Sequence, residues 1–309
     1  MNPASARLAH DVGSRALAWL HAHREYGTLD RLIDSYLGED ADAYKALGET
    51  ALAASLVLRG GLAGAADLER ARDLLDFGWA QLGEGSLLYE RLLRHPLHTD
   101  PLELYLPFAR AGYRYPPLDR LLAHTRTLPS VHAVEMLPNR RLAIANALRV
   151  TGFDDGGRTT DWAALARATW LGNTPEPWNI DWITGYTVTH TVFHLTDWGA
   201  LPDGLPKNLA GYVANWLPVW TNVWAEIGQW DLMVELMIVG ACLPEPQITT
   251  DAWQRLAGLQ HDDGLVPRDG EPVEEDPARR FHAHQHPTVV AAVAGTLALM
   301  RTLDTPRPA

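Results

Sequence analysis

Residues 182–199 read WITGYTVTHTVFHLTDWG, an apolar run that ends on a glycine. Its apolar side chains recur with the period of a helix, and a glycine after such a run marks a helix C-terminus, because glycine adopts the left-handed conformation without a Cβ clash. Similar runs followed by glycine recur from residue 101 onward at intervals of about 40 to 55 residues, the size of a helical repeat. The glycines are Gly112, Gly152, Gly199, Gly240 and Gly295.

Almost every segment between turn residues has a 3.6-residue apolar period, which predicts an all-α protein. Richly apolar helices are expected over residues 45–59, 101–111, 138–151, 183–198, 229–242 and 287–301. Amphipathic helices are expected between them, over residues 6–24, 66–81, 116–126, 160–170, 206–225 and 250–260. Pro101, Pro138 and Pro287 are expected in the first turns of three apolar helices, where a missing N–H costs nothing.

This alternation predicts one domain over residues 1–309, an (α/α)6-type toroid in which an inner ring of helices is wrapped by an outer ring. Helices that are apolar all round suit the inner ring, and helices with one polar face suit the outer ring. An open superhelix of helical hairpins is the alternative. The apolar last helix favours closure, because the terminal helix of an open array is usually polar on its outer side.

Composition narrows the range of partners. The net charge of −12 argues against a nucleic-acid partner, which needs a basic face. The single cysteine, Cys242, excludes a disulfide framework. The chain shows neither a secretion signal nor the roughly 20-residue apolar run of a membrane span, so a cytoplasmic protein is expected, with a homodimer left open. The 12 tryptophans suggest a Trp-lined ligand cavity, or simply a well-filled core.

The recurring glycines align a set of side chains. The residues that lie nine positions before these glycines are Glu103, Ala143, His190, Asp231 and His286. Four of these five side chains are ionisable, so equivalent helices would carry polar groups at the same depth. A shared central chamber is therefore expected, with its mouth at the N-termini of the apolar helices, where long, polar loops enter.

Two helices carry spacings that suit a metal ion. His190 and His194 lie four residues apart, and Asp231 and Glu235 repeat that spacing on the next apolar helix. Imidazole and carboxylate groups from adjacent helices form a ligand shell suited to zinc, iron or manganese. Packed core histidines and an aspartate at a helix start are the structural alternative.

Two further stretches contribute candidates. Residues 281–287, FHAHQHP, would direct His282, His284 and His286 to one side if extended, as a metal or proton-transfer element. Asp100-Pro-Leu-Glu103 also has the form of a capping box, which gives Glu103 a structural alternative. The residues expected to contact substrate at the mouth are Trp182, Tyr186, Trp230 and His282.

Residues 252–267, AWQRLAGLQHDDGLVP, resemble the L-Q-x-x-D-G turn of α/α-toroid proteins, the superfamily of terpene cyclases and protein prenyltransferases. The stretches HTVFHLTDWG (190–199) and HPTVVAA (286–292) resemble an actinobacterial family of toroids that carries no known activity. That resemblance implies a setting in specialised metabolism.

These observations predict an enzyme that acts on a hydrophobic or amphipathic small molecule, or a modified peptide. A divalent metal held by His190, His194, Asp231, Glu235 and His286 would act as Lewis acid in a lyase, cyclase or hydrolase. The catalytic residues would be His190, Asp231, His286 and Glu103. Two alternatives remain, a metal-free acid–base epimerase, lyase or cyclase, and a helical-repeat binding protein without catalysis.

Overall fold

The structure is a computed structural model that describes residues 3–29, 41–153 and 155–303. All regular elements in these ranges are helical, and none of them is a strand. None of the described helices combines the length and apolar character that a membrane span requires. The all-α class expected from the sequence is therefore confirmed.

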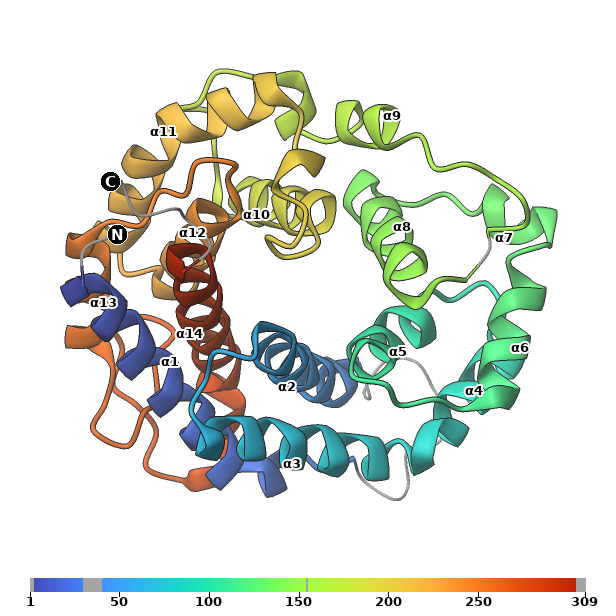
Figure 1. Ribbon diagram of the computed structural model, residues 1–309, viewed down its shortest axis with the longest axis horizontal. Helices are drawn as coiled ribbons and strands as arrows, with labels where there is room; N and C mark the ends of the chain where they lie inside the picture. The colour runs from blue at the N-terminus through green and yellow to red at the C-terminus, as the bar shows by residue number, and fades with distance from the viewer. Residues whose placement is uncertain (1–2, 30–40, 154, 304–309) are drawn as a thin grey trace.

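Six helices form a closed cycle around the centre of the molecule (Figure 1). Each packs against the next, and the last returns to the first. In this order they are α2 (Ala41–Gly60), α5 (Asp100–Arg110), α8 (Pro138–Thr151), α10 (Trp182–Thr196), α12 (Trp230–Cys242) and α14 (Pro277–Leu303). These are the six richly apolar helices of the sequence, and α12 is buried along almost its whole length.

The amphipathic helices lie outside this cycle (Figure 1). They are α1 (Pro3–Ala22), α3 (Ala65–Gln81), α4 (Ser86–Arg94), α6 (Pro116–Thr125), α7 (Pro129–Ala133), α9 (Trp162–Arg167), α11 (Lys207–Glu226) and α13 (Thr250–Leu259). Short 3-10 turns span Arg24–Gly27, Gly83–Gly85, Leu171–Asn173 and Pro202–Gly204. The sequence did not predict α4 or α7, and α9 is shorter than expected.

The expected start of the last apolar helix is wrong. Helix α14 begins at Pro277, so Pro287 lies inside it and not in its first turn. The residue after this proline ties α14 to the segment that precedes it. Thr288 donates its hydroxyl to the carbonyl of His284 at 2.8 Å and accepts a hydrogen bond from the Val266 N–H at 3.0 Å.

The recurring glycines have two different roles. Gly112 and Gly152 follow the ends of α5 and α8 and have φ values of 96° and 73°, as a left-handed helix end requires. Gly199 has a φ of 74°, but it lies three residues past α10, whose left-handed cap is Asp197. Gly240 and Gly295 lie inside α12 and α14, so the prediction that they end helices is wrong. Their role is close packing. A Cβ on Gly295 would lie 2.5 Å from the Ala9 carbonyl oxygen of α1.

A buried ion network joins the C-terminal ends of four inner helices. Asp197 is the residue after α10, and its carboxylate accepts hydrogen bonds from Arg110 of α5 at 2.5 Å and from Arg59 of α2 at 3.2 Å. Arg59 also donates to the Trp198 carbonyl at 2.6 Å, and Arg149 of α8 donates to the His194 carbonyl at 2.8 Å. We call Asp197, Arg59, Arg110 and Arg149 the Asp197 network. The Asp197 network brings together the C-terminal ends of four helices that pack side by side, so these four helices run parallel to one another.

Helix α1 covers the place where the cycle closes, packing against α13 and α14. The Ser5 and Thr250 hydroxyls are 2.7 Å apart, and the Arg15 guanidinium donates to the His261 carbonyl at 2.6 Å. The Gln260 side chain donates to the Val12 carbonyl at 3.1 Å. We call these contacts the α1 seam.

Replacement of Asp197 by asparagine is expected to lower the free energy of unfolding by about 3 kcal/mol, because it leaves two buried arginines without a counter-charge. Asparagine tolerates the left-handed conformation of residue 197, where φ is 44°, so backbone strain does not confound the result. Urea denaturation measures the change. The exposed Asp203 supplies the matched control, and Asp203→Asn should change stability by less than about 0.5 kcal/mol.

Two glycines inside helices should respond to alanine with opposite signs. Gly295→Ala is expected to cost about 1–3 kcal/mol, because the added methyl group meets the backbone of α1. Gly258 of α13 has open space around it, so Gly258→Ala should stabilise the protein by about 0.5–1 kcal/mol through helix propensity. Thermal unfolding of both variants tests this, and equal effects would contradict the packing role of Gly295.

Candidate functional site

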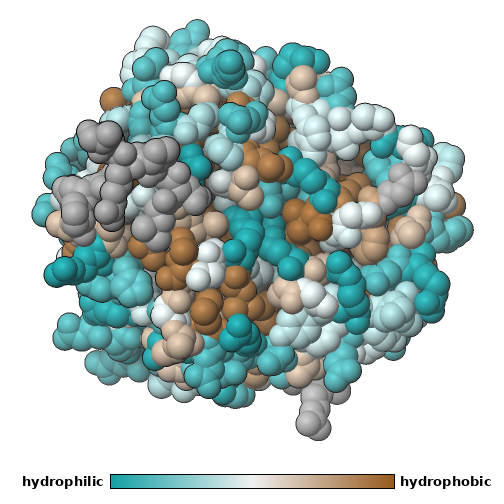
Figure 2. All heavy atoms as spheres, in the orientation of Figure 1, coloured by the Kyte–Doolittle hydropathy of each residue, from teal (hydrophilic) through white to brown (hydrophobic). Residues whose placement is uncertain are grey.

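A cavity of about 660 Å³ lies between the inner helices α2, α5, α8 and α10. Its wall is largely apolar, and charged side chains from the N-terminal parts of α2, α5 and α8 add a polar rim. The apolar residues that line it include Leu52, Leu104, Leu106, Pro107, Ala143 and Trp198. Figure 2 shows apolar and polar residues side by side at the centre of the molecule. We call this space the central cavity.

His286 of α14 lies between two carboxylates. Its Nδ1 atom is 3.1 Å from Glu49 of α2, and its Nε2 atom is 3.5 Å from Glu235 of α12. Burial lowers the pKa of this imidazole, but the two carboxylates outweigh burial and raise it to about 10. His286 is therefore an imidazolium at neutral pH. Glu49 also lines the central cavity, so this ion pair reaches the cavity wall.

Glu235 is the common partner of several side chains, although it is only 2% exposed. It accepts a hydrogen bond from the Thr189 hydroxyl at 2.5 Å and lies 3.9 Å from Nε2 of His190. Burial raises the pKa of this carboxyl group, but His286, His190 and Thr189 outweigh burial and lower it. The side chain is thus a buried carboxylate. We call Glu235, His286, Glu49, His190 and Thr189 the Glu235 network.

A second proton-bearing pair lies beside this network. The Tyr186 hydroxyl of α10 donates to Asp231 of α12, and Asp231 also accepts the Leu232 N–H at 2.8 Å. Burial and the neighbouring Asp231 carboxylate raise the pKa of Tyr186 above its usual value. The phenol therefore keeps its proton at neutral pH.

His190 and His194 share one stripe of α10, as the sequence predicted, with ring centroids 6.2 Å apart. The side chain of His190 is 47% exposed, although α10 belongs to the inner cycle. His194 lines the central cavity, and burial lowers its pKa to about 3, so it is neutral. Its buried Nδ1 atom has no hydrogen-bond partner among the described residues.

Glu103 also lines the central cavity but lies outside the Glu235 network. Its carboxylate accepts the Thr99 hydroxyl at 2.8 Å and lies 2.9 Å from Arg140. Burial, only partly offset by Arg140, raises its pKa. In the predicted capping box Glu103 would accept the backbone N–H of Asp100. Its side chain accepts the Thr99 hydroxyl instead. Asp100 pairs with Arg91 instead.

The prediction that residues 281–287 are extended is wrong, because they belong to α14. On a helix His282 and His286 share a face, and His284 points to the opposite side. His284 is buried, with Nε2 2.8 Å from Glu274, and Nδ1 accepts the Arg268 N–H. His282 is exposed beside Phe281 and contacts no member of the Glu235 network.

The predicted substrate-binding tryptophans do not line the central cavity. Trp182 is 58% exposed at the start of α10, with its ring 6.1 Å from that of Tyr186. Trp230 is half-buried at the start of α12, and its backbone N–H donates to the Arg268 carbonyl at 3.3 Å. The tryptophan in the cavity wall is Trp198.

The sequence did not identify Glu49. The other candidates lie nine residues before a glycine, but no glycine lies nine residues after Glu49. Counting back nine residues from Gly60 leads to Ala51. One signal was available, an acidic residue inside a richly apolar helix, the same pattern that identified Glu235.

Among the described residues, no three His, Cys, Asp or Glu side chains are grouped as a metal ion would need.

A family model matches residues 13–296, and the chain therefore belongs to the family DUF6895, described as a domain of unknown function. The match covers all six inner helices except the last turns of α14. No curated protein and no solved structure matches the chain.

The protonation of His286 can be tested directly. Its folded pKa of about 10 lies above the ordinary value, so its stabilising effect is complete below about pH 6.5 and is lost as pH rises through 10. The imidazole NMR signals of His286 should not titrate between about pH 6 and pH 8 in the wild type. Glu49→Gln should bring the midpoint down. A wild-type midpoint near 6.5 would contradict the ion pairs.

Proposed function

We propose that this protein is an (α/α)6-type toroid enzyme of specialised metabolism. In this proposal an apolar or amphipathic small molecule, or a modified peptide side chain, binds in the central cavity. The closed cycle of inner helices supports the toroid assignment, because a ring of parallel helices encloses a chamber. A mostly apolar cavity with a few converging polar groups is the usual form of a small-molecule site.

The proposed chemistry is metal-free acid–base catalysis. The observation that carries it is the convergence of two imidazoles on one buried carboxylate, with Nε2 of His190 3.9 Å and Nε2 of His286 3.5 Å from Glu235. The half-exposed His190 would accept a proton from substrate. The imidazolium of His286 would stabilise the negative charge that develops, as a preorganised cation does most effectively in a buried site. Epimerases, lyases and cyclases that remove a proton next to a carbonyl group need this pair.

The remaining polar groups have supporting roles in the proposal. Tyr186 and Asp231 position α10 against α12, and the phenol oxygen, whose proton is donated to Asp231, can accept a hydrogen bond from substrate. His194 lines the central cavity one helical turn from His190, and its unpartnered Nδ1 atom is buried. Glu103, with Arg140, would contribute to the charged rim.

Deuterium exchange tests the proposal without a known substrate. Purified protein is incubated in D2O with the small-molecule fraction of bacterial extracts, and mass spectrometry follows label uptake or consumption. We expect at least one compound to change, and His190→Gln and His286→Gln to slow that change by about 100-fold or more. His124→Gln, an exposed substitution in α6, is the matched control. The absence of any change in the wild type would favour a binding protein and overturn the enzyme assignment.

The same convergence supports a second candidate, metal-assisted catalysis. His190, His286 and Glu235 could close around zinc, iron or manganese if Glu49 moved away from His286. Asp231 and His194 would then lie one helical turn away from the ion on α12 and α10. Elemental analysis of the purified protein separates the candidates. If the protein holds a stoichiometric metal, and if removing the metal abolishes the activity and adding it back restores the activity, the metal-assisted candidate replaces the metal-free proposal.

A further inference from the structure

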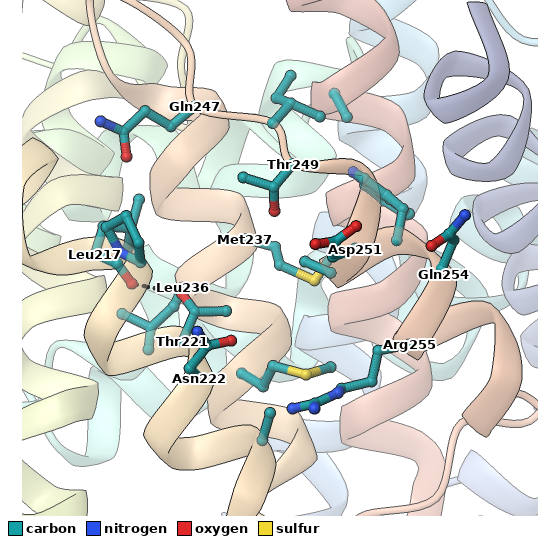
Figure 3. Close-up of a pocket in the computed structure, with 17 residues that line it drawn as sticks. Leu217, Thr221, Asn222, Leu236, Met237, Gln247, Thr249, Asp251, Gln254 and Arg255 are labelled. Atoms are coloured by element: carbon teal, nitrogen blue, oxygen red, sulfur yellow. Dashed lines mark hydrogen bonds between the residues drawn. The ribbon is translucent and has the colours of Figure 1, made fainter. Parts of the chain in front are cut away.

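A second cavity, of about 370 Å³, lies between α11, α12 and α13 on the outer side of α12 (Figure 3). None of its lining residues belongs to the Glu235 network or the central cavity. We call it the outer cavity. Its size falls within the range of small-molecule sites, which is about 300–1,000 Å³.

The wall of the outer cavity is apolar and adaptable. Leu217, Leu236 and Trp253 line it together with Met233 and Met237. Methionine is unbranched and polarisable, so two methionines in one wall can adjust to ligands of different shape. In the chain only five methionines occur, and two of them meet here.

Hydrogen bonds fix the chain segment that forms the upper edge of the outer cavity. Pro218 lies inside α11 and lacks an N–H, so the carbonyl of Ala214 loses its partner within the helix. The Gln247 side chain donates to that carbonyl at 2.9 Å, and the Gln247 N–H donates to the Gly240 carbonyl at 3.0 Å. The segment before α13 is thereby fixed above the space, as Figure 3 shows.

One cation stands at the rim. The exposed side chain of Arg255 lines the cavity and forms no hydrogen bond or ion pair with any residue that the structure describes. Figure 3 shows its guanidinium group extended across the lower side of the cavity toward Asn222. A guanidinium group matches a carboxylate in geometry and charge. Asp251 lies on the same rim and disfavours a ligand with a second negative charge.

We propose that the outer cavity binds a small monocarboxylate with a short apolar chain. Its carboxylate contacts Arg255 and Asn222, and its chain lies against Met237, with the fully buried Met233 behind it in the wall. This proposal does not depend on the proposed function, because the two cavities share no lining residue.

Methionine-methyl NMR with octanoate as the probe tests the proposal in the full chain. Protein labelled with 13C at the methionine methyl groups should show saturable shifts of the Met233 and Met237 signals. The signals of Met136 and Met300, which do not line the outer cavity, should stay unchanged. Met233→Leu and Met237→Leu assign the peaks. Octanoate that leaves the signals of Met233 and Met237 in place would overturn the proposal.

The role of the carboxylate is tested with 1-octanol and a charge variant. Arg255→Gln should weaken octanoate binding by about tenfold or more and leave octanol binding unchanged, because only the acid uses the guanidinium group. Arg167→Gln, an exposed change on α9, is the matched control. Equal octanoate binding by Arg255→Gln and wild type would show that the charge plays no part and would contradict the proposal.

A blocking pair separates the two cavities. Met237→Trp should abolish octanoate binding, and Ala143→Trp, which fills the central cavity, should leave it intact. The opposite pattern would place octanoate in the central cavity and refute the outer site. If Met237→Trp does not fold, the Met233 and Met237 shifts in the wild type still decide the question.

Discussion

The Asp197 network is the constraint on which the arrangement of the inner helices depends. Burying a carboxylate is costly unless cations or hydrogen-bond donors accompany it, and around Asp197 the cations come from three different helices. Arg59, Arg110 and Arg149 each lie in the last turn of their helix, where the dipole also favours a positive charge. One aspartate thereby fixes the C-terminal ends of four helices. The N-terminal parts of α2, α5 and α8 carry the charged rim of the central cavity, and the Glu235 network joins α2 and α10 to α12 and α14.

The sequence predicted the helices well, because an apolar stripe of helical period is a local property. All twelve expected helices overlap observed ones, and the alternation of apolar and amphipathic segments matches the inner and outer positions. The alignment by glycines singled out His190, Asp231 and His286. In the structure His190 and His286 both lie near Glu235, and Asp231 pairs with Tyr186, one turn before His190 on α10.

The remaining features depend on contacts between distant segments, which a periodic pattern does not encode. Glu49 was missed because its importance comes from His286, on another helix. Helix α14 starts before its expected proline, and the Val266 N–H, which donates to the Thr288 hydroxyl, ties it to the preceding segment, a contact between separate segments that the local pattern does not show. Gly295 was assigned to a helix end because only the approach of α1 reveals its packing role. The orientation of Trp182 and His282 likewise follows from neighbours that the local sequence does not specify.

The α1 seam has a consequence for how the chain acquires its shape. Ser5 and Thr250 are 245 residues apart in the chain, and Val12 and Gln260 are 248 apart. During translation α1 leaves the ribosome long before α13 and α14 exist, so it can pack early only against α3, and the surface that meets α13 and α14 stays uncovered until they follow. Contacts of such long range slow folding, because the entropy of closing the loop is lost before the contact is gained.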